Sequence, residues 1–160
     1  MKFRTHLAFG LLMGLSFLLL SDYSDGTDKV LFIAFALLGS ALPDIDTASS
    51  KLGSKIWPLS KIIEMFMGHR GIFHSIWLII LFPGIVYLYL SKIYGIALFV
   101  GYSSHVFIDG FTKKGVNFLN PFLELRLSGF VETGSFLELI IFIAILVLDA
   151  ALILRILSLA

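Results

Sequence analysis

Cysteine is absent from the 160-residue sequence, and charged residues make up only 14% of it. Without cysteine there can be no disulfide, no thiolate nucleophile and no cysteine-type zinc site, so any metal must use nitrogen and oxygen ligands. The net charge of +1 comes with no basic cluster, and nucleic-acid binding is therefore not expected. The zincin, serine-hydrolase and P-loop motifs are absent as well, which excludes those enzyme classes.

Hydrophobic residues, in contrast, make up 58% of the chain, and its mean hydropathy of +0.97 is typical of a protein surrounded by lipid. Apolar runs predict helices at roughly 4–20, 28–42, 72–90, 93–110 and 135–155. No small-x-small cleavage site follows the first run, so we expect it to be retained. The sequence predicts an all-α integral membrane protein, with one domain over residues 1–160 and a bundle of about five transmembrane helices.

A short amphipathic segment lies between the second and third runs. Apolar residues recur there with the period of a helix at Leu59, Ile62, Ile63, Phe66 and Met67. Polar residues occupy the opposite face at Ser60, Lys61 and Glu64. This pattern is typical of a short helix in the membrane interface. Packing of the segment on the bundle, without contact with lipid, is the alternative.

Lysine and arginine are unevenly divided between the two sides of the five runs. The side that carries the N-terminus has nine: Lys2, Arg4, Lys51, Lys55, Lys61, Arg70, Lys113, Lys114 and Arg126. The other side has three: Lys29, Lys92 and Arg155. Because positive charge is retained in the cytoplasm, we expect a multi-pass protein of the cell membrane with a cytoplasmic N-terminus.

The remaining ionisable residues gather at helix ends on this same side. They are His6, Asp44, Asp46, His69, Arg70, His74, His105, Asp109, Glu132 and Glu138, and they include all four histidines. Such side chains are costly in a bilayer unless they face a polar interior and find partners. The second and fourth runs are shorter than the roughly 20 residues of a span, so their polar ends should lie below the headgroup surface. We therefore expect one shared site.

Residue spacing favours metal binding at this site. His105 and Asp109 are four apart, so a helix places both on one face, where they can bind one cation. Pro43 disfavours a continuous helix, and Asp44 and Asp46 should follow on irregular backbone that lines a cavity. Taken singly, each residue could instead be a packing histidine, a helix cap or a snorkelling cation. Taken together, they predict the metal ligands His6, Asp44, Asp46, His74, His105 and Asp109.

Mixed histidine and carboxylate ligands suit zinc, with manganese or iron as alternatives, and their number allows one or two ions. Two ions bridged by Asp44 or Asp46 would lower the pKa of a bound water and hold a phosphoryl or acyl oxygen. We expect His74 on the third long helix, with His69 approaching from the preceding turn.

Several further residues have predicted roles. Arg70 would bind a substrate phosphate, and His69 and Glu138 would be catalytic residues beside it. Nearby serines, Ser75, Ser104 and Ser135, would support the ligands by hydrogen bonds. Acids outside the set, among them Glu64 and Asp149, are interpreted as solvated or interfacial.

Short motifs recur in a fixed order along most of the chain. After His6 come G-S-x-x-P-D-I-D at 39–46, H-R-G-x-x-H-S at 69–75, S-H-x-x-x-D at 104–109, T-x-x-G at 112–115, Pro121 and T-G-S-x-x-E at 133–138. In these residues the chain resembles the YdjM-like family, described as membrane-bound metal-dependent hydrolases with a LexA-regulated bacterial namesake. The resemblance implies hydrolase activity. Phe73 stands where a small or polar residue is expected, which affects a substrate contact and leaves the ligands intact.

Three functions are compatible with these observations. The first is a metal-dependent hydrolase that cleaves a phosphoester bond of a lipid or lipid-linked substrate, since the site should lie at about headgroup depth. The second is a transporter of metal or solute, which the lack of a repeat and of polar residues at the midplane disfavours. The third is a membrane protein in which a metal only joins the helices.

Overall fold

The computed structural model describes residues 1–21, 26–67 and 72–158. Within these residues the chain forms α1 (Phe3–Leu20), α2 (Gly26–Ala41), α3 (Trp57–Met67), α4 (Ile76–Tyr89), α5 (Lys92–Gly110) and α6 (Phe136–Ser158). Short 3₁₀ helices are η1 (Leu42–Asp46), η2 (Gly53–Ile56) and η3 (Ile72–His74). A small antiparallel hairpin pairs β1 (Val116–Asn117) with β2 (Arg126–Leu127).

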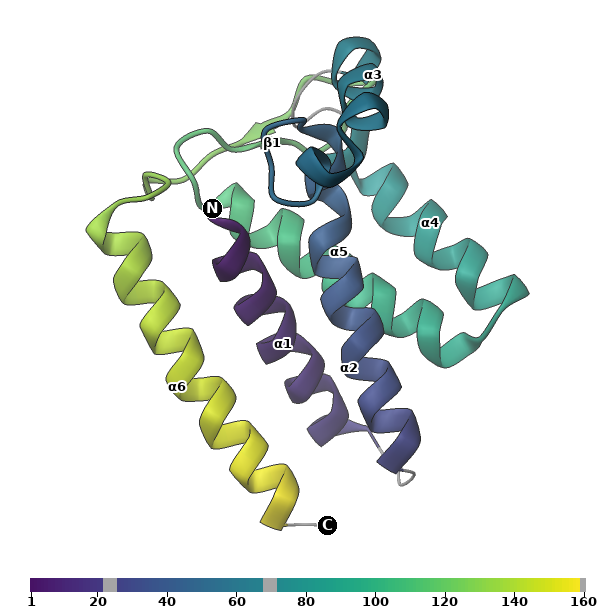
Figure 1. Cartoon of the computed structure of the whole chain (residues 1–160), viewed down its shortest axis with the longest axis vertical. Helices are drawn as coiled ribbons and strands as arrows, with labels where there is room; N and C mark the ends of the chain where they lie inside the picture. Colours follow the sequence, from purple (N-terminus) through teal and green to yellow (C-terminus); the bar gives the residue numbers. More distant parts are fainter. Residues whose placement is uncertain (22–25, 68–71, 159–160) are drawn as a thin grey trace.

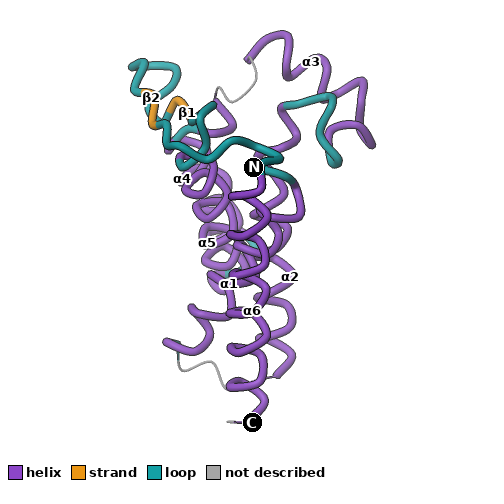
Figure 2. The backbone as a smooth tube through the Cα atoms, turned by 90° about the vertical axis from the view of Figure 1, so that its left-hand side faces the viewer, coloured by secondary structure: helices purple, strands orange, loops and turns teal. Residues whose placement is uncertain are grey.

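The prediction of an all-α protein is confirmed, and each of the five apolar runs forms a helix. In the described part of the chain, α1 and α6 are long and apolar enough to cross a membrane, whereas α4 is apolar but shorter. The long helices run side by side and alternate in direction (Figure 1). The N-terminus, η1 and the hairpin lie at one end of the bundle and the C-terminus at the other. Figure 2 shows α3 at the same end as the hairpin, on a different side.

The core of the bundle is formed by α1, α2 and α5, with α4 packed on α5 and α6 packed on α1. Glycines allow α2 and α5 to approach closely. A Cβ atom at Gly39 would lie 2.6 Å from the Leu98 carbonyl oxygen, and one at Gly101 would overlap the Ala36 carbonyl oxygen. Small residues at a helix contact let the two backbones meet, as is common in membrane bundles. This close approach brings the C-terminal end of α2 against the ionisable residues of α5.

The third long helix begins later than predicted, at Ile76 instead of residue 72. Ser75 has extended backbone, with φ −93° and ψ 157°, so the chain cannot continue helically from η3 into α4. The Ile76 N–H donates to the Phe118 carbonyl oxygen at 3.0 Å, a tertiary bond from the segment after α5. The prediction that His74 lies on the long helix is therefore wrong, since His74 ends η3.

The amphipathic segment forms α3, which turns Ser60 and Glu64 of its polar face toward the protein, while Lys61 is exposed. Ser60 is fully buried, and Glu64 accepts a hydrogen bond from the Ala48 N–H at 3.2 Å. On the other face, Leu59 is 53% exposed, Ile62 52% and Met65 72%. Glu64, predicted to be solvated or interfacial, is partly exposed, and its carboxylate also bonds the chain that follows η1.

Asp149 is buried, contrary to the prediction that it is solvated or interfacial. It is 3% exposed and lies on the one buried stripe of α6, together with Ile145 and Glu138. The helical period explains this placement, because Asp149 follows Ile145 by four residues and so lies on the face that packs against α1. Within the described residues its carboxylate has no hydrogen-bond partner.

Candidate metal centre

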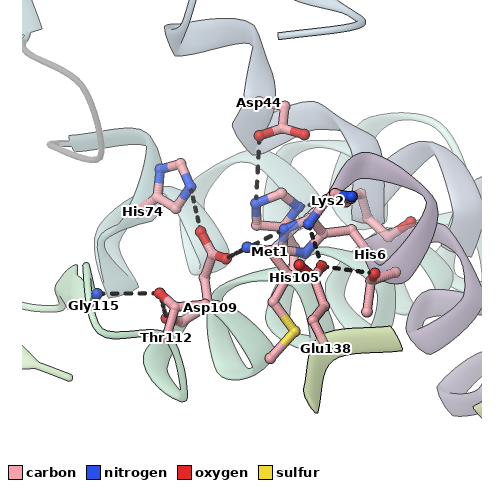
Figure 3. Close-up of polar contacts among 12 residues, drawn as sticks. Met1, Lys2, His6, Asp44, His74, His105, Asp109, Thr112, Gly115 and Glu138 are labelled. Carbon is pink, nitrogen blue, oxygen red and sulfur yellow. Dashed lines mark hydrogen bonds and ion pairs between the residues drawn. The ribbon is translucent and has the colours of Figure 1, made fainter. Parts of the chain in front are cut away.

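Histidines and acids from four elements meet at the end of the bundle that carries the N-terminus (Figure 3). The contributing residues are His6 from α1, Asp44 and Asp46 from η1, His74 from η3, and His105 and Asp109 from α5. All except Asp44 are at most 1% exposed. Elements far apart in the sequence thus place buried ionisable groups around one point.

Asp109 lies at the centre of the cluster. One ligand atom from each of His6, His105 and Asp109 lies within 4.8 Å of the others, a spacing at which they could hold a metal ion. His6 Nε2 is 3.3 Å from Asp109 Oδ1, and the rings of His6 and His105 stack with centroids 3.7 Å apart. The Met1 amine contacts the same Asp109 oxygen. The central carboxylate is therefore surrounded by nitrogen atoms.

His74 joins this cluster through its Nε2 atom, 3.8 Å from Asp109 Oδ2. Its other nitrogen, Nδ1, lies 3.1 Å from Asp46 Oδ2. Asp46 also accepts a hydrogen bond from the Thr47 hydroxyl at 2.9 Å. These contacts are those of a carboxylate that orients a histidine, because a ring held through Nδ1 presents Nε2 to the cluster. The predicted role of Asp46 as a direct ligand stays a prediction.

His105 is oriented in the same way by the backbone of α2. Its Nδ1 lies 2.6 Å from the Ser40 carbonyl oxygen, which can only accept, so Nδ1 is the donor and Nε2 carries the lone pair. His105 Nε2 faces Asp44 Oδ1 at 3.9 Å. The Asp44 side chain is 19% exposed, and burial raises the pKa of its carboxyl above the ordinary value. Asp44 thus closes the cluster on its accessible side.

Three imidazole nitrogens in the cluster have no hydrogen-bond partner among the described residues. They are His6 Nδ1, His74 Nε2 and His105 Nε2, and all are buried. Buried polar atoms are nearly always satisfied, so such a group needs an explanation. For His74 and His105 the opposite nitrogen is held by a hydrogen bond, which is the usual arrangement of metal-binding histidines. The residues present therefore fit a divalent cation.

Glu138 is near the cluster but uses its carboxylate to join α6 to α1. Oε1 accepts hydrogen bonds from the Lys2 N–H at 2.5 Å and the Thr5 hydroxyl at 2.9 Å. Oε2 accepts one from the Gly134 N–H at 2.5 Å. These bonds fix the start of α6 beside the N-terminal end of α1. The predicted catalytic role of Glu138 stays a prediction, as do those of His69 and Arg70, which lie outside the described residues.

Three serines were predicted to support the metal ligands. Each of them forms a hydrogen bond with a residue three positions away in the chain. The Ser75 hydroxyl donates to Ile72 and the Ser104 hydroxyl to Gly101, each to a backbone carbonyl, while Ser135 accepts from the Glu138 N–H. Sequence reasoning missed Ser40, whose carbonyl holds His105. The sequence did offer one signal. Gly39 and Ser40 are two consecutive small residues shortly before the P-D-I-D motif, and small residues indicate a close helix contact.

Comparison with known proteins identifies the family of the chain. A family model described as YdjM inner membrane protein matches residues 1–159. The chain belongs to the YdjM family. This confirms the resemblance found in the motifs, and it shows that the chain is a membrane protein in contact with the lipid bilayer.

Two known proteins illustrate the similarity. A Bacillus subtilis (strain 168) protein described as the uncharacterized protein YvsG is 35% identical over 118 residues, covering 72% of this chain and 74% of that protein. The Escherichia coli (strain K12) inner membrane protein YdjM is 35% identical over 92 residues, covering 54% of this chain and 47% of that protein. No solved structure matches the chain.

Proposed function

We propose that the chain crosses the cell membrane several times, with α1, α2, α4, α5 and α6 as spans and the metal centre at the cytoplasmic face. Two observations support this arrangement. The five helices alternate in direction, so their ends divide between two sides (Figure 1). The side that carries the cluster has nine lysines and arginines in the sequence, and the other side has three. Because loops rich in lysine and arginine are retained in the cytoplasm, this difference supports a cytoplasmic cluster.

The metal ligands in this proposal are His6, His74, His105 and Asp109, with Asp44 completing the set. Asp109 directs Oδ1 toward His6 and Oδ2 toward His74, so its carboxylate would help to hold one or two ions; a bridge by Asp44 or Asp46 stays a prediction. Asp46 orients His74 through Nδ1. Nitrogen and oxygen donors of this kind suit zinc, manganese or iron.

The function that this geometry supports best is a metal-dependent hydrolase acting on a phosphoester bond of a lipid or lipid-linked substrate. The observation that carries the proposal is the pair of buried, unpaired Nε2 atoms of His74 and His105 beside Asp109, with His6 Nε2 3.3 Å from the same carboxylate. A divalent ion bound there acts as a Lewis acid toward a phosphoryl oxygen and lowers the pKa of water. Asp46 and the Ser40 carbonyl hold the histidine rings in place. Asp44 is the accessible member of the cluster, with a side chain that is 19% exposed.

Metal analysis of the purified protein tests the first requirement of this proposal. We expect wild type to carry one or two divalent ions per chain and Asp109→Asn to carry almost none. Asp149→Asn is a matched control, because it neutralises a buried carboxylate in a different helix. Metal absent from wild type, or retained equally in Asp109→Asn, would refute the proposed centre.

An activity screen tests the second requirement. Metal-loaded protein is incubated with phosphatidic acid, an isoprenoid diphosphate and a soluble phosphomonoester, and phosphate release is measured. We expect release from a lipid substrate in wild type and in Asp149→Asn, and none in Asp109→Asn. Release from the soluble ester alone would contradict the assignment of a lipid substrate.

A structural metal site is the second candidate, and one observation favours it. Every proposed ligand except Asp44 is at most 1% exposed, as in closed sites that only join secondary structure. If a chelator lowers the unfolding temperature of the loaded protein strongly and none of the three substrates is hydrolysed, the structural function replaces the enzymatic one.

A further inference from the structure

A groove with a volume of about 880 Å³ opens between α1, α4 and α5 and ends at the segment that follows α5. Its lining is almost entirely apolar and includes six phenylalanines: Phe9, Phe99, Phe107, Phe111, Phe118 and Phe130. Several of these are well exposed, Phe107 at 60% and Phe130 at 70%, so the groove is open along its side. A pocket of this size and composition is typical of a binding site for an apolar ligand.

The groove and the candidate metal centre use residues of the same helices, although none of the six cluster residues lines the groove. On α5, Ser104 and Gly110 line the groove and are the immediate neighbours of His105 and Asp109. On α1, Phe9 lines the groove one helical turn after His6. A ligand lying in the groove would therefore have one end close to the metal-binding residues.

The end of the groove near the hairpin has a rim of exposed cations that adjoin its lining residues in the chain without lining the groove themselves. Leu127 and Ser128 line the groove, and Arg126 precedes them on β2, where its guanidinium donates to the Lys114 carbonyl oxygen at 2.6 Å. Lys114 is exposed, whereas the neighbouring Lys113 pairs with Glu132 at 2.8 Å. An apolar groove that ends at exposed cations is complementary to a molecule with a hydrocarbon tail and an anionic head.

We propose that the groove binds an acyl chain of an anionic phospholipid, with its phosphate at the rim formed by Lys114 and Arg126. The binding site stands on its own evidence, while the statement that this lipid is the substrate of the metal centre rests on the proposed function. Lateral access from the bilayer then explains how a lipid reaches a buried centre.

Selectivity must come from packing and charge, not from the hydrophobic effect. An acyl chain in the bilayer is already in an apolar medium, so moving it into the groove removes no apolar surface from water. What the groove adds is contact on several sides, together with ionic contact at the rim. By contrast, exposed α6 residues such as Ile143 and Val147 belong to a helix that lines no part of the groove. They provide an internal reference for ordinary lipid contact.

Photo-crosslinking in membranes tests the proposal. The full chain is reconstituted into phosphatidylcholine vesicles that contain a small fraction of phosphatidylglycerol with a diazirine in the half of one acyl chain that is nearer the headgroup. After irradiation, labelled residues are mapped by peptide mass spectrometry. We expect labelling of Phe107, Phe111 and Phe130 to exceed that of Ile143 and Val147 several-fold. Equal labelling of the two sets would mean ordinary lipid contact and would overturn the proposal.

Two matched glycine variants test the groove itself. A Cβ atom at Gly110 or at Gly84 meets nothing within 4 Å, but only Gly110 lines the groove. Gly110→Leu should fill part of the groove and lower its labelling several-fold, whereas Gly84→Leu, on α4, should leave it unchanged. Equal labelling in both variants overturns the proposal. If Gly110→Leu does not fold, the smaller substitution Gly110→Ala replaces it. Its labelling is then compared with that of the wild type, and labelling equal to wild type overturns the proposal.

A probe with a zwitterionic head tests the rim. Phosphatidylcholine carrying the same diazirine should label the groove less than the phosphatidylglycerol probe, and Lys114→Gln should reduce the difference. Equal labelling by both probes overturns the assignment to anionic lipids. Labelling requires no metal, so its failure in a protein that binds metal and hydrolyses phosphoesters refutes the groove alone. Groove labelling in a wild-type protein that binds no metal and hydrolyses none of the three substrates refutes the hydrolase alone.

Discussion

The ring nitrogens of the three described histidines decide the chemistry of the cluster. His74 and His105 each have Nδ1 held by an oxygen atom, so each presents Nε2 to the interior. Such orienting partners raise the basicity of a ligand and fix its direction, and their loss usually lowers metal affinity. A metal ligand can therefore be distinguished from an orienting residue by metal affinity. Substitution of a ligand should lower the affinity more than substitution of an orienting residue does.

Asp46→Asn tests this distinction. We expect metal affinity to fall about 10- to 100-fold, because the amide keeps the shape but loses the charge that holds His74. Isothermal titration with zinc on metal-free protein measures the change. Glu132→Gln, an exposed acid paired with Lys113, is the control and should bind as wild type does. A loss as complete as that of Asp109→Asn would instead make Asp46 a direct ligand.

Glu138→Gln tests whether this residue is structural or catalytic. Three hydrogen bonds end on its carboxylate, and hydrogen bonds to a charged group each contribute about 1.5–3 kcal/mol. We expect a lower unfolding temperature with unchanged metal content and unchanged hydrolysis per folded molecule. If hydrolysis is lost while the unfolding temperature stays the same, Glu138 belongs to the reacting groups as the sequence predicted.

At the scale of helices, the contact between α2 and α5 positions the cluster. Gly39 and Gly101 bring the two backbones together, and the Ser40 carbonyl reaches His105 only because of that approach. The helices themselves follow from hydropathy, whereas the distance between them follows from the absence of side chains at two positions. Metal binding and helix packing are therefore coupled through this contact.

Gly101→Ala tests the coupling. The added methyl group would overlap the Ala36 carbonyl oxygen, and overpacking of this kind typically costs about 1–3 kcal/mol. We expect a lower unfolding temperature and weaker zinc binding, because α2 must shift away from α5. Gly84→Ala, where the added group meets nothing within 4 Å, should change neither property. Normal zinc binding by a destabilised Gly101→Ala would show that the cluster is independent of this contact.

At the scale of the whole molecule, the bundle separates a polar end from an apolar body. The buried histidines and acids of the cluster lie at the end that carries the N-terminus, and the C-terminus lies at the opposite end (Figure 1). Because the two ends differ, the proposed orientation has a direct test, and the absence of natural cysteine makes single-cysteine labelling possible.

Single cysteines at Lys92 and Lys113 test the orientation. A membrane-impermeant maleimide added to intact cells should label Lys92→Cys, at the start of α5, and should label Lys113→Cys only after the membrane is permeabilised. Wild type, which lacks cysteine, is the control. The opposite pattern would place the cluster outside the cell, and labelling of both positions from outside would contradict a span between them.

The sequence alone determined the helical class, the five apolar helices to within a few residues and, among the described residues, the histidines and aspartates that gather at one end. These follow from hydropathy and from spacings of three or four residues, which depend only on near neighbours in the chain. The tertiary structure decided the late start of α4, the burial of Asp149, the part of the polar face of α3 that points inward and the nitrogen that each histidine presents. Each of these depends on a partner from another element, such as Ser40 for His105 or Asp46 for His74, and local sequence carries no information about which partner will be near.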